Sequence, residues 1–229
     1  MWNCESVSVS GELFLPEGFE STVFIDSIPE TVRHIAVDAT GKVYAKFNKP
    51  SDRGVLIALK DVTHDGVADS IIPFGNYSAP QKGGYSTAAR IYEGYLYFSS
   101  RLAVYRYKLN ADTMIPAGPL ETVVLDDHSL GSHEHIAKPI AFDNDGNLYV
   151  PFGAPSNACQ EPKRTPFQAG LNPCPQLIDH AGIWKFDAHQ LNQTQADGER
   201  YATGIRSLVA MDWNMQENCL FAVVHGRDD

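Results

Sequence analysis

The sequence predicts an all-β fold built from short antiparallel strands joined by tight turns. Residues 34–44 and 139–149 share one design: an apolar strand, a turn with aspartate and glycine, and a second apolar strand that ends in tyrosine. The turn glycines Gly41, Gly94 and Gly146 recur about every 50 residues, a period typical of repeat folds. No helical period of apolar residues extends beyond a turn or two. Repeats of short strands with glycine turns are typical of β-propeller blades.

The expected strands follow the same order in each repeat. Every glycine hairpin is followed by a further apolar strand, at residues 54–59, 103–107 and 182–186. A fourth hairpin is expected over residues 208–221. The sequence therefore predicts about three and a half blades in one partial propeller domain that covers residues 1–229. Because an unpaired blade edge is a liability, we expect this chain to be an incomplete part of a closed ring.

The third repeat is longer than the first two because a loop around residues 154–181 stands between its strands. Insertions of this kind project from one rim of a fold and often shape a site. The loop holds Cys159 and Cys174, whose spacing is not that of a metal-binding C-x-x-C. A disulfide between them would restrict the loop in the unfolded chain, and the alternative is two free thiols.

A disulfide would indicate an oxidising compartment, so we expect an extracellular or periplasmic protein. The first residues lack the charged and apolar regions of a secretory signal. Either the protein is intracellular, or its signal has been removed or lost.

Composition excludes several classes of function. The chain has 229 residues, 43% of them hydrophobic, and a formal net charge of −10, so it can bury a core and would repel nucleic-acid phosphates. No apolar run approaches the ~20 residues that span a bilayer. Dinucleotide, Walker and serine-hydrolase motifs do not occur.

Histidines give the first candidate for catalysis. His128, His133 and His135 occupy one loop just before the strand that begins near Pro139. Imidazole accepts a proton near neutral pH, which suits a general base for alcohol oxidation. The alternatives are a polar surface loop, or a metal site at His133 and His135 for which the sequence places no third ligand.

Two later segments also carry polar groups at strand ends. Arg206 follows a strand-like run, where its planar fork could hold a carboxylate or quinone oxygen, or form a salt link between blades. Residues 225–229 follow an apolar strand, and backbone carbonyls beside Gly226 would suit Ca²⁺ as ligands. The alternative is an ordinary turn at the end of the strand. Residues 61–69 resemble half of a calcium loop but lack two of its ligands, which predicts an Asp-Gly turn.

The ordered set of His135, the Cys159/Cys174 loop, Arg206 and residues 225–228 resembles the soluble PQQ-dependent sugar dehydrogenases, of the glucose, sorbosone and pyranose types. The resemblance runs along nearly the whole chain. Its other segments are residues 15–19, 33–38, 94–100 and 104–107. It implies a six-bladed propeller that holds PQQ and Ca²⁺ near its central axis.

The resemblance also implies roles for single residues. His135 would act as the general base that takes the proton of the sugar's anomeric hydroxyl while hydride passes to PQQ. Arg206 would hold a PQQ oxygen and stabilise charge that develops on the reduced quinone. Lys138 would be the neighbouring basic group at the cofactor. Ser207 stands where this family usually has asparagine, so one amide contact to PQQ would be missing.

The same resemblance places calcium at the end of the chain. The backbone carbonyls of Gly226 and Arg227 would face Ca²⁺, which would polarise the quinone. The remaining ligands of Ca²⁺ and PQQ would belong to later blades.

The expected function is PQQ-dependent oxidation of an aldose or pyranose sugar, with electrons passed to an external acceptor and with no nucleic-acid partner and no membrane span. One alternative is a Ca²⁺-dependent lactonase on a similar propeller, which would hydrolyse a sugar lactone with a metal-bound water. Another is a non-catalytic propeller that binds a carbohydrate or a protein through its rim, which the serine at position 207 favours.

Overall fold

The computed structural model describes residues 13–77, 88–128 and 134–228. Its strands form three four-stranded antiparallel sheets and one antiparallel pair. The first sheet contains β1 (Val32–Val37), β2 (Val43–Ser51), β3 (Gly54–Lys60) and β4 (Ser70–Phe74). The second contains β5 (Ala89–Tyr92), β6 (Tyr95–Ser99), β7 (Ala103–Lys108) and β8 (Glu121–Leu125). The third contains β9 (Ala141–Phe142), β10 (Asn147–Phe152), β11 (Gly182–Asp187) and β12 (Glu199–Thr203), and the pair is β13 (Leu208–Asn214) with β14 (Cys219–Val224).

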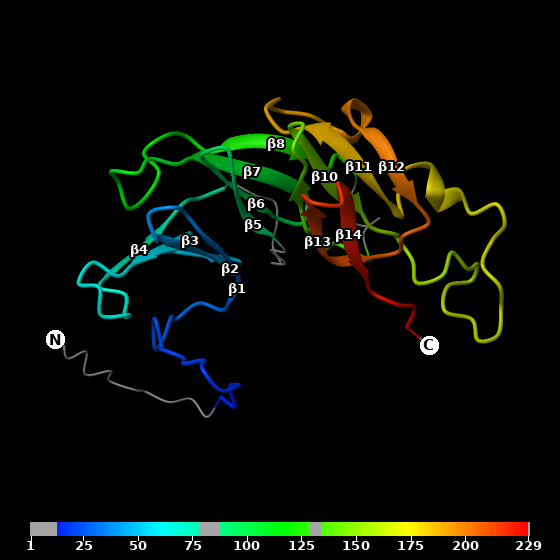
Figure 1. The fold of residues 1–229 in the computed structure, drawn as a ribbon. Coiled ribbons are helices and arrows are strands. Elements are labelled where there is room, and N and C mark those ends of the chain that lie inside the picture. Colours follow the sequence, from blue (N-terminus) through cyan, green and yellow to red (C-terminus); the bar gives the residue numbers. More distant parts are fainter. Residues whose placement is uncertain (1–12, 78–87, 129–133, 229) are drawn as a thin grey trace.

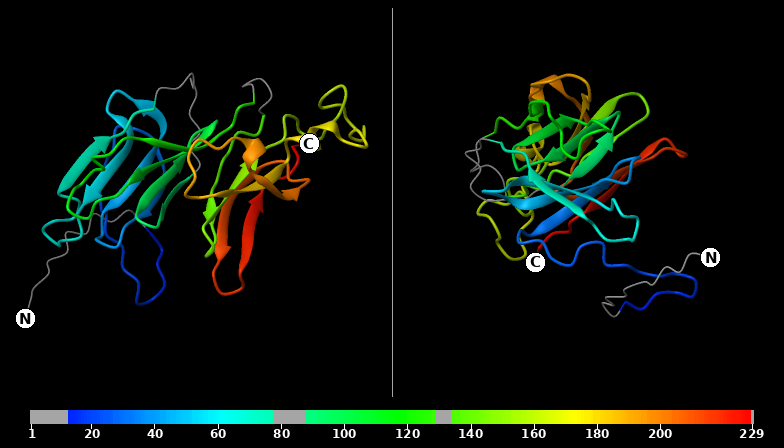
Figure 2. Two further views of the ribbon diagram at one scale, coloured as in Figure 1. Left: turned by 90° about the horizontal axis from the view of Figure 1, so that it is seen from above. Right: turned by 90° about the vertical axis from the view of Figure 1, so that its left-hand side faces the viewer.

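Each sheet is a meander in which neighbouring strands follow one another in the sequence. The sheets lie side by side along the molecule, with β5–β8 between β1–β4 and β9–β12 (Figures 1 and 2). Strand β1 of the first sheet contacts β5 of the second, and β13 of the pair contacts β9 of the third sheet. The prediction of an all-β propeller with about three and a half blades is confirmed. The assignment of residues 1–229 to a single domain stays a prediction.

The turn between the first two strands of each four-stranded sheet contains a glycine, with an aspartate close by in the first and third sheets. Gly41, Gly94 and Gly146 have φ angles of 80°, 77° and 85°, which glycine adopts without steric cost. In the turn between β9 and β10, Asp143 Oδ1 accepts hydrogen bonds from the backbone N–H groups of Asp145 and Asn147, at 2.9 Å each. In the first and third sheets the aspartate side chain closes the turn and the glycine lets the chain reverse. The turn between β5 and β6 consists instead of Glu93 and Gly94, both at positive φ.

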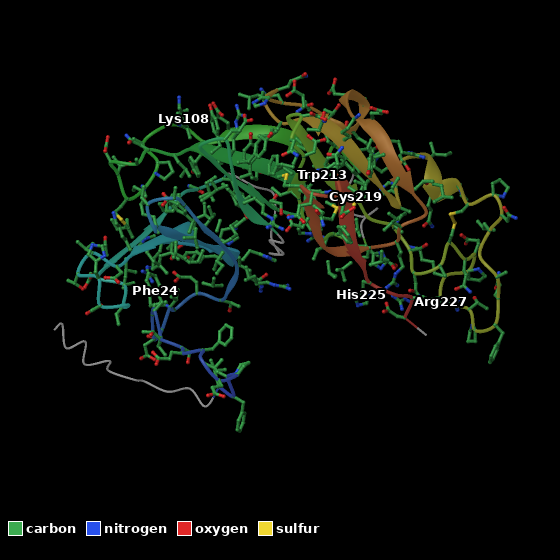
Figure 3. The ribbon with its side chains drawn as sticks, in the orientation of Figure 1. Phe24, Lys108, Trp213, Cys219, His225 and Arg227 are labelled. Carbon is green, nitrogen blue, oxygen red and sulfur yellow. A yellow bond between two sulfur atoms is a disulfide. The ribbon has the colours of Figure 1, made fainter. Side chains whose placement is uncertain are left out.

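Most of the core lies between neighbouring sheets, and one further cluster packs β2 and β3 against the segment around residues 24–28. One buried cluster joins the second and third sheets, where Tyr92 stacks on Phe142 with ring centroids 4.3 Å apart. A second cluster joins the first and second sheets, and a third joins β9–β11 to the β13–β14 pair. Figure 3 shows Trp213 and Cys219 in this last pair. Each sheet therefore depends on its neighbour for burial, as blades of a propeller do.

A lysine stands inside this core. Lys46 on β2 is fully buried, and its Nζ donates a hydrogen bond to the Phe47 carbonyl at 3.0 Å. The ammonium lies 5.5 Å from the ring centroid of Tyr77 and 5.7 Å from that of Phe98. Burial lowers the pKa of Lys46 to about 7, because the charged form is costly away from water.

We expect Lys46→Met to remove a pH dependence of stability. The unfolded chain keeps the lysine proton up to about pH 10.5, whereas the folded chain releases it near pH 7. The unfolded state thus binds more protons in this window, and the free energy of unfolding rises between pH 7 and 10. Urea unfolding across this range should show the rise in the wild type and in Lys108→Met, whose lysine is exposed, but not in Lys46→Met. An unchanged slope in Lys46→Met would contradict the assignment.

Candidate functional site

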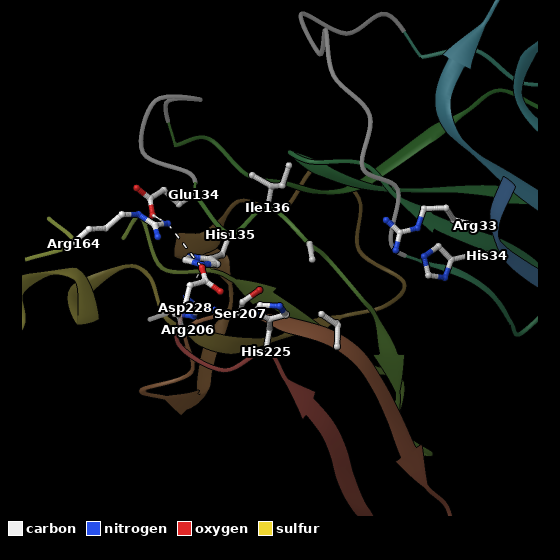
Figure 4. Close-up of a pocket in the computed structure, with 12 residues that line it drawn as sticks. Arg33, His34, Glu134, His135, Ile136, Arg164, Arg206, Ser207, His225 and Asp228 are labelled. Carbon is white, nitrogen blue, oxygen red and sulfur yellow. Dashed lines mark hydrogen bonds and ion pairs between the residues drawn. The ribbon is translucent and has the colours of Figure 1, made fainter. Parts of the chain in front are cut away.

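A cleft of about 470 Å³ opens where the first strands of the sheets come together (Figure 4). Arg33 and His34 reach it from β1, residues 134–137 from the segment before β9, and Ser207 from just before β13. The segment after β14 adds His225 and Asp228. The remaining lining residues are Arg164, Arg206 and Val209. The volume is in the range of small-molecule sites.

One ring nitrogen of His135 forms a hydrogen bond with the backbone, and the other can accept a proton. Its Nδ1 lies 2.6 Å from the Ala154 carbonyl, which can only accept, so Nδ1 carries the proton and Nε2 keeps a lone pair. Burial lowers the pKa of His135, and the nearby Arg206 guanidinium adds to this effect. The imidazole is therefore neutral near pH 7 and able to accept a proton at Nε2.

The position of His135 depends on a glycine. A Cβ on Gly153 would lie 2.1 Å from the His135 carbonyl oxygen and 2.7 Å from its Cβ, so no other residue fits there without displacing the histidine. The next residue, Ala154, accepts the His135 hydrogen bond and donates its own N–H to the Arg206 carbonyl at 2.8 Å. The end of β10 thus sets the positions of both His135 and Arg206.

Arg206 uses its planar fork to join distant segments. One end of the guanidinium donates to Asn157 Oδ1 and lies 3.4 Å from Asp228 Oδ2. The other end donates to His225 Nδ1 at 2.8 Å and to the Gly226 carbonyl. Because a guanidinium only donates, His225 Nδ1 accepts and its proton lies on Nε2. The Nε of Arg206 is buried and has no hydrogen-bond partner within the described residues.

The segment that follows β14 is held close to the insertion. Asn157 Nδ2 donates to the Asp228 carbonyl at 2.6 Å, and the Asp228 N–H donates to Asn157 Oδ1 at 3.1 Å. The hydrogen bond from Arg206 lowers the pKa of the Asp228 carboxyl, so it is ionised near neutral pH. Gly226 and Arg227, the expected calcium positions, lie on this exposed segment, and Figure 3 shows His225 and Arg227 just beyond β14.

The structure brings together most of the predicted site residues, but not all. His135, Arg206 and Ser207 line the cleft, and Gly226 contacts Arg206. Lys138 does not line it: its buried Nζ pairs with Asp126 Oδ2 at 2.6 Å and lies 4.4 Å from the centroid of the Phe152 ring. Its contact with the cofactor stays a prediction.

The other candidates from the sequence, where the structure describes them, do not line the cleft. His128 faces Asp126 and Asp179 instead of the cleft, and His133 lies outside the described residues. In the loop over residues 61–69, the carboxylates of Asp61 and Asp69 accept hydrogen bonds from backbone N–H groups. That loop leads into β4, which confirms the predicted Asp-Gly turn.

The predicted disulfide between Cys159 and Cys174 is present. It closes the insertion, whose first residues hold Arg206 through Asn157. The bridge is consistent with an oxidising compartment. Within the described part of the chain, no helix is long and apolar enough to cross a membrane.

Sequence reasoning missed several residues that line the cleft. Arg33 and His34 were assigned only to a hairpin strand, and Arg164 only to the insertion. The repeats align Arg33 with Lys138, yet only Arg33 lines the cleft, so a basic residue at this position of the repeat was not a sufficient signal.

Comparison with known protein families finds none that matches this sequence, and no curated protein matches it either. Solved structures do share its fold. The PQQ domain of pyranose dehydrogenase from Coprinopsis cinerea, in its holo form, superposes with a TM-score of 0.62 at 15% identity, over 86% of this chain and 44% of that one. A calcium structure of a Trichoderma reesei protein of Carbohydrate-Active Enzymes family AA12 gives 0.66 at 17% identity, over 90% and 48%.

The PQQ-bound aldose sugar dehydrogenase of Streptomyces coelicolor gives a TM-score of 0.55 at 15% identity, over 90% of this chain and 60% of that one. The chain thus spans about half the length of these proteins. At such identities the comparison defines a class of fold: this chain has the architecture of about half of a six-bladed propeller.

We expect Gly153→Ala to destabilise the protein by about 2 kcal/mol, because a methyl group at this position overlaps the His135 backbone. Gly118→Ala is the matched control, since a Cβ at Gly118 meets no atom within 4 Å. Urea unfolding monitored by tryptophan fluorescence measures both. Equal stabilities of the two variants would show that Gly153 does not fix His135.

Proposed function

We propose that this protein takes part in the PQQ- and Ca²⁺-dependent oxidation of an aldose or pyranose sugar, with His135 as the general base. The observation that carries the proposal is the pairing, in one cleft, of a neutral imidazole whose Nε2 is available with the arginine fork of Arg206. The shared fold with PQQ-binding sugar dehydrogenases supports it.

The cleft suits an anionic quinone cofactor. PQQ carries three carboxylate groups and quinone oxygens, which need cationic donors. Three arginines, Arg33, Arg164 and Arg206, line the cleft against two carboxylates, in a chain whose net charge is −10. The buried Nε of Arg206 is a donor for which the described residues provide no acceptor. A planar fork of this kind matches carboxylate and quinone oxygens.

A hard cation would find oxygen ligands beside these donors. The carbonyl groups of Gly226 and Arg227 and the ionised Asp228 carboxylate belong to one exposed segment, and oxygen is the ligand that Ca²⁺ prefers. Arg206 now donates to the Gly226 carbonyl, so binding of the ion there would release the arginine toward the cofactor.

The chemistry of the chain's own residues follows from their placement. When bound, PQQ would accept the hydride from the carbon that is oxidised. His135 would remove the hydroxyl proton at Nε2 while Nδ1 stays bonded to Ala154, so the imidazolium would form with its ring already oriented. Arg206 would stabilise the negative charge that develops on the cofactor as it accepts the hydride. Ser207 is buried and follows Arg206 in the sequence. Its hydroxyl would hydrogen-bond the cofactor over a shorter reach than the side-chain amide of an asparagine.

Compartment and partners follow as part of the proposal. A disulfide-closed insertion beside the cleft fits an extracellular or periplasmic enzyme. We propose that electrons leave through an external acceptor.

The decisive test is dye reduction by the full-length protein with PQQ, Ca²⁺ and a panel of aldoses and pyranoses. His135→Gln should lower turnover by roughly 10²- to 10⁴-fold, the usual contribution of a general base, and still bind PQQ. His189→Gln, a change of a half-exposed histidine outside the cleft, is the control and should keep full activity. Full activity in His135→Gln, or no turnover of any sugar by the wild type, would sink the proposal.

The pH profile gives an independent test. Because burial lowers the pKa of His135, the base stays unprotonated below the usual value of about 6.5 for histidine. The acidic limb of the kcat/KM profile should therefore have its midpoint below that pH. The limb should be absent from the residual activity of His135→Gln. A limb well above pH 6.5 would point to another base.

PQQ uptake separates this proposal from a propeller lactonase. Quenching of tryptophan fluorescence by PQQ should saturate in the wild type and weaken in Arg206→Lys, because lysine cannot reproduce the fork. A lactonase would hydrolyse its substrate with Ca²⁺ alone and show no saturable uptake of the quinone.

A further inference from the structure

A second cluster of polar side chains lies outside the cleft. His128, Asp179 and His180 each offer a ligand atom, and these atoms lie within 4.8 Å of one another. Within the described ranges 13–77, 88–128 and 134–228, this is the one group of three such side chains so arranged. It joins the segment after β8 to the end of the insertion just before β11.

The Asp179 carboxylate lies between the two imidazoles. Its Oδ2 is 3.5 Å from His128 Nε2 and its Oδ1 is 2.7 Å from His180 Nδ1. Two ligand atoms bound to one tetrahedral zinc ion at 2.1 Å lie roughly 3.4 Å apart, close to the first of these distances. The two rings lie near each other as well, with centroids 4.4 Å apart.

His128 is oriented as a metal ligand would be. Its Nδ1 lies 2.9 Å from Asp126 Oδ1, and its Nε2 faces the Asp179 carboxylate. Asp126 is itself buried and paired with Lys138 Nζ at 2.6 Å. A carboxylate behind a histidine fixes the ring and raises its basicity, which is the usual support of histidine ligands in metal sites.

The other two residues are also held in place. Asp179 follows the 3-10 helix η2 (Pro175–Ile178), which begins directly after the disulfide-bonded Cys174. The Asp179 carbonyl accepts a hydrogen bond from Gln195 at 2.6 Å, and the His180 N–H donates to the Gln176 carbonyl at 3.0 Å. Little backbone movement would be needed to gather the three ligands, because both ends of this segment are fixed.

We propose that His128, Asp179 and His180 bind a divalent transition-metal ion, for which Zn²⁺ is the best fit. Two imidazoles and one carboxylate are a donor set that zinc accepts, whereas Ca²⁺ and Mg²⁺ favour all-oxygen ligands. The ion would take the place of the hydrogen bond between His180 Nδ1 and Asp179 Oδ1. His180 is buried while Asp179 is 47% exposed, which leaves a fourth position open to solvent.

Such an ion would have a structural effect. It would tie the segment after the second sheet to the insertion of the third, at the opposite end of the insertion from Asn157. Since an ion that binds the folded form alone stabilises it, the thermal midpoint should rise with its concentration. This site is independent of the proposed oxidation, because none of its three ligands lines the cleft.

The test is titration of the metal-free, tag-free protein with Zn²⁺ by calorimetry, with Co²⁺ absorption as a probe of tetrahedral coordination. The wild type should bind one ion and unfold at a higher temperature with Zn²⁺. Loss of a ligand should weaken binding beyond the roughly 10- to 100-fold that loss of a supporting residue costs. We therefore expect a more than 100-fold weaker affinity in His128→Asn and in Asp179→Asn, with no thermal shift.

His189→Asn is the matched control, since His189 is half-exposed and paired with Glu93 outside the cluster. It should bind Zn²⁺ as the wild type does. Asp179→Asn changes a half-exposed side chain to an isostere, so it tests the site even if His128→Asn does not fold. Unchanged affinity in Asp179→Asn, or tight binding that is lost only in His225→Asn, would overturn the proposal.

Discussion

The cleft depends on the guanidinium of Arg206. This side chain joins the start of the insertion, through Asn157, to the segment after β14, through His225 and Gly226. These segments are far apart in the sequence, and only the arginine fork has enough donors to reach them together. Its backbone carbonyl also accepts the N–H of Ala154, whose own carbonyl orients His135. Truncating this side chain would loosen the insertion and the segment after β14 together, whereas the backbone link to His135 through Ala154 would remain.

The propeller architecture explains why such distant segments meet. Buried clusters lie between sheets, so each blade fixes the angle of the next and brings its innermost strand toward a shared centre. The last pair, β13 and β14, has a packed neighbour in the third sheet, yet Phe221 and Val223 remain 58% and 57% exposed. Apolar side chains of this size on a strand pair are what the next sheet of a propeller would cover.

Much of the fold could be predicted from sequence because it is local and repeated. Asp143 and Gly146 close one hairpin by contacts within a few residues, and the same pattern recurs at Asp38 and Gly41. The resemblance to a known family also singled out His135 and Arg206, which line one cleft in the structure, while their roles stay predictions. Arg33 was missed because its role depends on where the first blade stands relative to the last, which no local pattern encodes.

The placement of Lys138 shows the same limit. As a basic residue near His135 it was predicted to contact the cofactor, which stays a prediction, and its side chain pairs with the buried Asp126 outside the cleft. A buried carboxylate without a partner would be costly, and that cost decides the direction of the lysine. His128 could be listed among candidate bases for a similar reason, although only folding shows that it faces Asp179 and His180.

The insertion connects the two sites physically. Its start holds Arg206 through Asn157, and its end supplies Asp179 and His180. The disulfide cross-links the residues that lie between them. Because the disulfide closes only residues 159–174, the ends of the loop remain separate attachments to the propeller. One attachment reaches the cleft through Arg206 and the other lies at the histidine cluster, so separate contacts hold the residues of the proposed oxidation and the ligands of the proposed ion.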